Sequence, residues 1–110
     1  MTLDELVTLL DDGSAVLVEA LSVAAYQAGH LPGAVNVPGP LSVDLAVALV
    51  PRRSESVVVY CSGPGCGRST LTARAFEHLG YSDVRVYPGG KAEWAEAGLP
   101  LTSRDPVTGR

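Results

Sequence analysis

The chain has 110 residues, of which 46% are hydrophobic and 18% are charged, and its formal net charge at pH 7 is −4. This length and composition predict one folded domain with a modest core rather than a disordered chain. No basic stripe is present, so neither nucleic acid nor an anionic membrane is an expected partner. The N-terminus lacks the basic region of a signal peptide and no apolar run reaches membrane-spanning length, so we expect a cytoplasmic protein.

Helical and strand periodicities alternate along the chain, separated by turn and capping residues. The expected elements, in chain order, are a helix after Thr2, a strand over 16–18, a helix over 23–28, a strand over 34–37, a helix over 41–50, a strand over 57–60, a helix over 68–79, a strand over 84–87 and a helix ended by Gly98. This alternation predicts a single α/β domain with a mostly parallel central sheet and helices on both faces. We expect the domain to span 1–103 and a flexible tail to follow over 104–110.

The stretch over 57–80 carries the candidate chemistry. A buried strand ends at Cys61, a glycine-rich turn follows, and a helix begins at Arg68. In open α/β sheets, ligands bind at the carboxyl ends of strands. Converging loop amides and a helix N-terminus would lower the pKa of the Cys61 thiol and make it nucleophilic. The alternative is a tight turn around a buried structural cysteine. The candidate substrate-binding loop comprises Ser62, Gly63, Pro64, Gly65, Cys66, Gly67, Arg68 and Ser69.

The two cysteines are too few for a disulfide scaffold. Cys61 and Cys66 have four residues and a bend between them, so a reversible disulfide is geometrically feasible. A zinc site would need two further ligands, and His30 and His78 lie in separate segments. We therefore expect no metal and no cofactor.

Two further motifs frame this loop. The sequence GHLPGAVNVP occupies positions 29–38, and YPGG occupies 87–90, followed by Trp94 and by GLP at 98–100. Together with the strand that ends in Cys61, these motifs resemble a single-domain rhodanese over nearly all of residues 1–101. The resemblance implies a sulfurtransferase in which Cys61 accepts a sulfane sulfur as a persulfide, for example from thiosulfate, and passes it to cyanide or a thiol. The implied partners are a small sulfur-containing anion or thiol and a sulfur-relay protein.

The chain departs from the family pattern at three places. Many rhodaneses have an aspartate and an arginine after the early strand, where this chain has Glu19 and no arginine. The six residues between Cys61 and Arg68 make the active loop longer than usual. Cys66 lies within this loop, as in a rhodanese subgroup with a second loop cysteine, and either resolves a Cys61 persulfide or disulfide or only fills the loop.

Two other functions remain open from the residues. The chain could be a non-catalytic rhodanese-like module that binds a protein or senses redox state through Cys61 and Cys66. It could also be a cysteine phosphatase or arsenate reductase, since related folds bind oxyanions in Cys…Arg-Ser loops. The spacing from Cys61 to Arg68 exceeds that of such loops, and no general acid is evident, so sulfur transfer is the preferred prediction.

Overall fold

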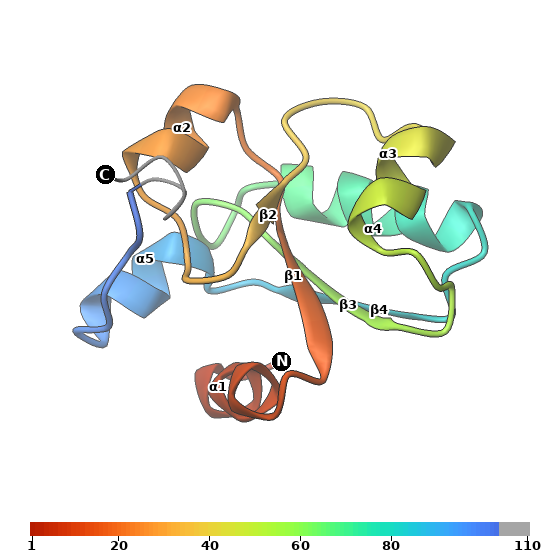
Figure 1. Cartoon of the computed structure of the whole chain (residues 1–110). Helices are drawn as coiled ribbons and strands as arrows, with labels where there is room; N and C mark the ends of the chain where they lie inside the picture. Colours follow the sequence, from red (N-terminus) through yellow and green to blue (C-terminus); the bar gives the residue numbers. More distant parts are fainter. Residues whose placement is uncertain (104–110) are drawn as a thin grey trace, which may run out of the picture.

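The computed structural model describes residues 1–103 as helices and strands that alternate along the chain (Figure 1). The predicted tail over 104–110 lies outside the described residues. The elements are α1 (Leu3–Asp12), β1 (Ala15–Glu19), α2 (Val23–Ala28), β2 (Val35–Asn36), α3 (Val43–Leu49), β3 (Ser56–Tyr60), α4 (Arg68–His78), β4 (Asp83–Tyr87) and α5 (Gly90–Glu96). The predicted α/β class and the order of its elements are confirmed.

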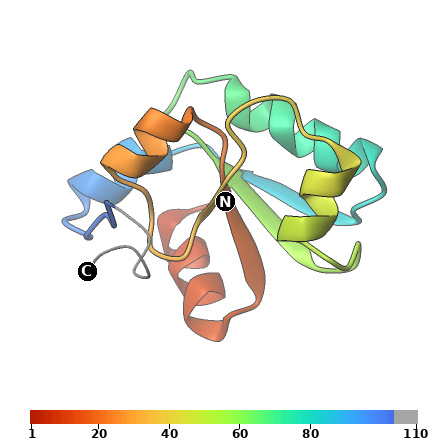
Figure 2. The same cartoon turned by 45° about the horizontal axis from the view of Figure 1, so that its top comes forward.

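The four strands form one sheet in the order β2-β1-β3-β4, and every neighbouring pair is parallel. Parallel pairing requires crossover connections, which the helices supply. Helices α3 and α4 lie on one side of the sheet, and α1 and α5 lie on the other (Figures 1 and 2). The sheet is therefore buried on both faces, as the uninterrupted apolar run in β3 predicts.

Side chains of β3 alternate between two separate cores. Val57 and Val59 point toward α3 and α4, where they pack with Phe76. Val58 and Tyr60 point to the opposite face and pack against residues of α1 and α5. This two-residue period is the geometry of a strand, and it explains why the sequence over 57–60 shows no polar face.

Capping residues set the ends of several helices. Thr2 accepts a hydrogen bond from the amide of Glu5, and the Glu5 side chain accepts one from the Thr2 amide, so the predicted capping box is confirmed. Helix α3 begins at Val43, two residues later than the predicted 41, because Ser42 Oγ accepts a hydrogen bond from the amide of Leu45. A side-chain acceptor at the N-cap outweighs the apolar pattern that precedes it.

Strand β2 is shorter than the predicted strand over 34–37. Its ladder to β1 pairs Val35 with Val18 and Asn36 with Glu19. One further bond joins the amide of Val37 to the carbonyl oxygen of Glu19, at 2.9 Å. Proline has no amide hydrogen, so the ladder cannot continue through position 38.

Among residues 1–103, no helix is long and apolar enough to cross a bilayer.

Candidate active site

The candidate site lies where the two central strands end. The chain passes from β1 to β2 on one side of β1, and then to β3 on its other side, so the strand order reverses between β1 and β3. Open α/β sheets bind ligands in the crevice at such a reversal. Glu19 ends β1, and its register partner Tyr60 ends β3 directly before Cys61. The structure therefore places Cys61 at the carboxyl end of a central strand, as predicted.

A tight loop connects Cys61 to α4. The amide of Cys66 donates to the carbonyl oxygen of Gly63 at 3.2 Å, and Gly65 has a φ of 88°, which favours glycine. Gly67 is the N-cap of α4 and supplies no side-chain acceptor to the first-turn amides. Ser69 is buried in that first turn, and its Oγ lies 3.4 Å from Cys61 Sγ.

Cys61 and Cys66 are joined by a disulfide, and their Cα atoms are 6.5 Å apart. The sequence left this bond open as one alternative, and the structure shows the loop bringing both sulfur atoms together. Cys61 is 2% exposed, whereas Cys66 is only half-buried. A cysteine is nucleophilic as its thiolate, so Cys61 could react as one only after a reductant had supplied two electrons to this bond.

The N-terminus of α5 packs against the same loop from the other side. The amide of Lys91 donates to the carbonyl oxygen of Cys61 at 3.1 Å, and the amide of Ala92 donates to that of Ser62 at 2.9 Å. A Cβ atom on Gly63 would lie 3.1 Å from the Cβ of Ala92. Two helix N-termini, those of α4 and α5, therefore border the cysteine loop, and their dipoles favour negative charge there.

A buried polar network lies beneath the loop. Glu19 is fully buried, and its Oε1 accepts a hydrogen bond from the Tyr60 hydroxyl at 2.5 Å. The Tyr60 oxygen in turn accepts from the amide of Leu31 at 3.1 Å. Lys91 Nζ lies 2.9 Å from Glu19 Oε2 and donates to the carbonyl oxygen of Ala25, also at 2.9 Å. Burial, together with the Glu19 carboxylate, raises the pKa of Tyr60, so its hydroxyl remains a proton donor.

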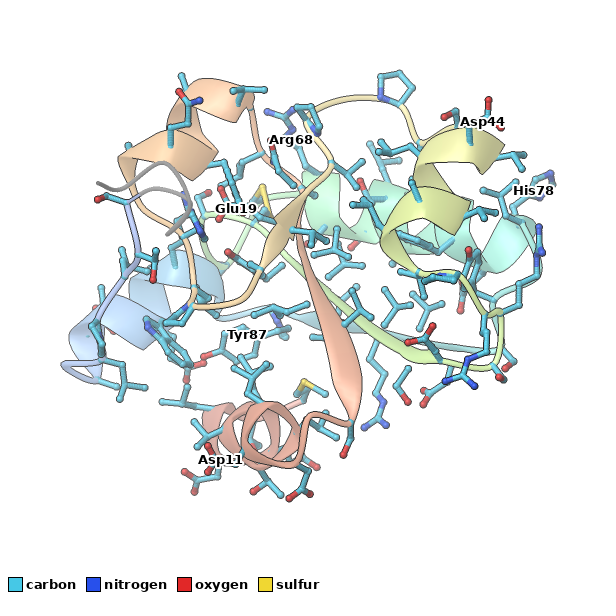
Figure 3. All side chains as sticks on the ribbon, viewed as in Figure 1. Asp11, Glu19, Asp44, Arg68, His78 and Tyr87 are labelled. Atoms are coloured by element: carbon cyan, nitrogen blue, oxygen red, sulfur yellow. A yellow bond between two sulfur atoms is a disulfide. The ribbon has the colours of Figure 1, made fainter. Side chains whose placement is uncertain are left out.

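Arg68 is an exposed residue at the start of α4, and its Nη2 donates to the carbonyl oxygen of Pro38 at 3.0 Å. It also lines a cavity of about 390 Å³ whose other walls are mostly apolar, among them Ala20, Leu41 and Leu71. Figure 3 shows Arg68 at the same end of the molecule as Glu19, with His78 at the far end of α4. The guanidinium is thus positioned beside the loop and has donors left for an anion.

The structure brings some predicted site residues together and leaves others apart. Ser69 approaches the sulfur of Cys61, whereas Ser62, Pro64, Gly65 and Gly67 are exposed. The cradle role of these exposed residues stays a prediction. Among residues 1–103, no three His, Cys, Asp or Glu side chains are grouped as metal ligands would be.

Lys91 and Tyr60 are site residues that the sequence analysis missed. Tyr60 was placed in the apolar strand, but its hydroxyl reaches the Glu19 carboxylate. Lys91 is the only lysine of the chain and follows the turn at Gly89 and Gly90. A cation at a helix N-terminus is disfavoured by the helix dipole. A lysine at this position was therefore the sequence feature that could have indicated a buried acidic partner. The cation that pairs with Glu19 thus comes from α5, not from an arginine after β1.

The fold and the loop define an α/β protein with a strand-end cysteine between two helix N-termini. The chain belongs to the rhodanese-like domain family, whose sequence model matches residues 2–97.

Several relatives support this assignment. An HTH-type transcriptional regulator of Mycobacterium tuberculosis is 34% identical over 107 residues, which cover 97% of this chain and 46% of the regulator. A putative thiosulfate sulfurtransferase of Synechococcus elongatus is 34% identical over 99 residues, covering 74% of this chain and 31% of that protein. The chain thus spans less than half the length of these curated relatives.

Among solved structures, the human single-domain sulfurtransferase superposes with a TM-score of 0.72 at 27% identity, covering 87% of this chain and 94% of that one. Thiosulfate sulfurtransferase from Pseudomonas aeruginosa gives a TM-score of 0.80 at 29% identity, covering 93% of this chain and 19% of that one. The likeness to the human protein extends over almost the whole of its solved chain.

Proposed function

We propose that this protein is a rhodanese-type sulfurtransferase in which Cys61 carries the transferred sulfur as a persulfide. The observation that supports it most is the position of Cys61, at the carboxyl end of β3 and between the N-termini of α4 and α5. Sulfurtransferases among the relatives of this domain add support. A thiolate and a terminal persulfide are both anions, and both are stabilised by the same helix dipoles.

The reaction begins with the reduced loop. The Cys61 thiolate attacks the sulfane sulfur of thiosulfate, the sulfur–sulfur bond of thiosulfate breaks, and sulfite leaves with the electron pair. The persulfide anion on Cys61 then faces the first turn of α4, where Ser69 Oγ is 3.4 Å from Sγ. An acceptor thiolate or cyanide attacks the outer sulfur, and the Cys61 thiolate leaves. Arg68 is the cation that would bind the doubly charged donor beside the loop.

The disulfide favours a second candidate function, a redox-sensing module. Cys66 is close enough to Cys61 to bond to it, and a reversible bond of this kind changes the loop that contacts α4 and α5. A relative that is a transcriptional regulator is compatible with such a role. In a persulfide mechanism the same cysteine would act as a resolving thiol: the Cys66 thiolate attacks Sγ of the Cys61 persulfide, the bond from Sγ to the outer sulfur breaks, and the outer sulfur takes a proton from solvent and leaves as hydrosulfide.

Intact mass spectrometry separates the two functions. The wild type, Cys61→Ser and Cys66→Ser are fully reduced, freed of reductant and incubated with thiosulfate. A persulfide adds roughly 32 Da, and a disulfide removes roughly 2 Da. We expect Cys66→Ser to gain the sulfur and to lose it again on addition of cyanide, whereas Cys61→Ser gains nothing.

The contrary result is equally clear. No adduct on Cys66→Ser under any thiosulfate concentration, with reversible loss of roughly 2 Da in the wild type alone, would reject sulfur transfer in favour of redox sensing. Release of sulfite, measured in parallel, shows whether any adduct is made by cleavage of thiosulfate itself.

A further inference from the structure

Glu19 is a fully buried carboxylate beside the strand that carries the cysteine. Its register partner on β3 is Tyr60, the residue that directly precedes Cys61. A buried carboxylate is strongly unfavourable unless hydrogen bonds and an opposite charge compensate it. The Tyr60 hydroxyl satisfies one carboxylate oxygen, and the second oxygen faces Lys91.

Lys91 supplies the compensating charge from the far end of the chain. Its side chain is 17% exposed, and its Nζ contacts both Glu19 Oε2 and the carbonyl oxygen of Ala25. It lies in the first turn of α5, where the helix dipole disfavours a cation. The buried Glu19 carboxylate therefore explains why a lysine occupies position 91, since the helix dipole alone disfavours a cation there.

The same residue also holds the cysteine loop. The backbone amide of Lys91 donates to the carbonyl oxygen of Cys61 at 3.1 Å, so one residue joins the buried carboxylate to the loop. Side chain and backbone act together: the ion pair fixes the start of α5, and the start of α5 fixes Cys61.

We propose that Lys91 is a positioning residue for Cys61. Lys91 neutralises the Glu19 carboxylate, so that no uncompensated negative charge acts on the Cys61 thiolate. This inference rests on the proposed function only in requiring that Cys61 react as a thiolate. Glu19 points with Tyr60 to the α5 face of the sheet, whereas the Cys61 sulfur lies toward Ser69 of α4, so an unpaired Glu19 carboxylate would act on the sulfur across the sheet, over roughly 10 Å when strands are about 5 Å apart. At that distance, in a partly buried site, one charge changes the thiolate-to-thiol ratio about tenfold.

The loop meets few other ionisable groups. Arg68 is the first residue of α4 after the loop, and two buried tyrosines, Tyr60 and Tyr87, end β3 and β4 with raised pKa values, so they stay neutral. Glu93 of α5 accepts a hydrogen bond from the hydroxyl of one of these tyrosines. The ionisable residues at the carboxyl ends of β1, β3 and β4 and in the first turns of α4 and α5 are Glu19, Tyr60, Tyr87, Arg68, Lys91 and Glu93. Only Glu19 and Lys91 form a buried pair of opposite charges.

The test measures the titration of Cys61 directly. In a Cys66→Ser background, where Cys61 is the only cysteine, the rate of iodoacetamide alkylation is followed from pH 4 to pH 10. The variants are Lys91→Met, Glu19→Gln, both together and the conservative Lys91→Arg. Arg85→Met is the matched control, since Arg85 is a cation paired with Asp83 at the surface.

The two single variants should move the alkylation midpoint in opposite directions. Lys91→Met leaves an unpaired carboxylate and should raise the midpoint by about one pH unit, whereas Glu19→Gln leaves an unpaired cation and should lower it. The double variant, Lys91→Arg and Arg85→Met should stay near the parent. The proposal is overturned if the alkylation midpoints of the two single variants shift in the same direction, as general loosening of the loop would cause. It is also overturned if the midpoint of Glu19→Gln does not shift.

Glu19→Gln also secures the test if Lys91→Met does not fold, because its amide keeps the shape of the side chain. The experiment is independent of sulfur transfer, since alkylation needs only a thiolate. If the protein forms no persulfide but the two single variants shift the alkylation midpoint in opposite directions, the proposed function is rejected and this inference is supported. If the persulfide forms but these shifts are not seen, the proposed function is supported and this inference is rejected.

Discussion

Gly90 lies against the backbone of Cys61 so closely that no other residue fits. A Cβ atom at position 90 would be 2.8 Å from the amide nitrogen of Gly63 and closer still to the carbonyl oxygen of Cys61. Gly90 also has a φ of 57°, in the left-handed region that favours glycine. The start of α5 can therefore hold the cysteine loop only because this position has no side chain.

Gly90→Ala should consequently destabilise the protein by about 2–4 kcal/mol, as the sum of left-handed strain and an overpacked contact. Gly98→Ala is the matched control: its φ is 79°, but a Cβ there would meet nothing within 4 Å. It should cost about 1–2 kcal/mol, from strain alone. Urea unfolding of both variants measures the difference, and equal free energies of unfolding would refute the close packing of α5 on the loop.

Tyr60→Phe should cost about 2–3 kcal/mol, because it removes a hydrogen bond to a buried carboxylate and leaves the amide of Leu31 without its acceptor. Tyr81→Phe is a suitable comparison, since Tyr81 is also buried and its hydroxyl donates only to the neutral carbonyl of Val50. That variant should cost about 1 kcal/mol. Thermal or urea unfolding at pH 7 tests the ranking, which fails if Tyr81→Phe proves the more damaging.

Arg68→Met should raise KM for thiosulfate about tenfold with a smaller effect on kcat, because a charge-assisted contact to the anion is lost while Cys61 is untouched. Arg74→Met serves as the control, since Arg74 is exposed on the same helix. Steady-state sulfite release gives both constants. An unchanged KM in Arg68→Met would remove Arg68 from the binding site and leave the hydrogen bond to Pro38 as its only role.

A pH-dependent contribution is expected at the pair Ser56 and Asp83, which face each other across β3 and β4. The Ser56 hydroxyl donates to Asp83, and this bond, with help from Arg85, holds the pKa of Asp83 below its usual 3.8. A carboxyl whose pKa is lowered by folding stabilises the protein fully at a pH above its unfolded-state pKa. This stabilisation is lost as the pH falls through the folded-state pKa.

Ser56→Ala should therefore lower the free energy of unfolding by about 0.5–1 kcal/mol at pH 7, discounted for the partial exposure of Asp83. The difference from the wild type should shrink as the pH falls from 4 toward 2. In an Asp83→Asn background the pH dependence of the difference should disappear. Urea titrations at several pH values provide the check, and a difference that grows on acidification would be incompatible with this sign.

The elements of the fold could be predicted from the sequence, because the signals that define them are local. The capping box at Thr2, the apolar run before Cys61 and the glycine turn that follows it each depend on neighbours within a few residues. Hydrogen bonds and packing over that range give strong periodicities and caps. The candidate cysteine loop and its place at the end of a strand could therefore be predicted without the structure.

The group that compensates the buried Glu19 carboxylate could not be predicted from the sequence, because it depends on long-range packing. Its partner Lys91 lies 72 positions later, and no local period connects an acid at the end of a strand with a cation in the first turn of a distant helix. The parallel sheet brings them together, because crossover connections return successive strands to one edge where their carboxyl ends meet. The bond between Cys61 and Cys66 was likewise open in the sequence, since spacing permits a disulfide but only the course of the loop places the two sulfur atoms in contact.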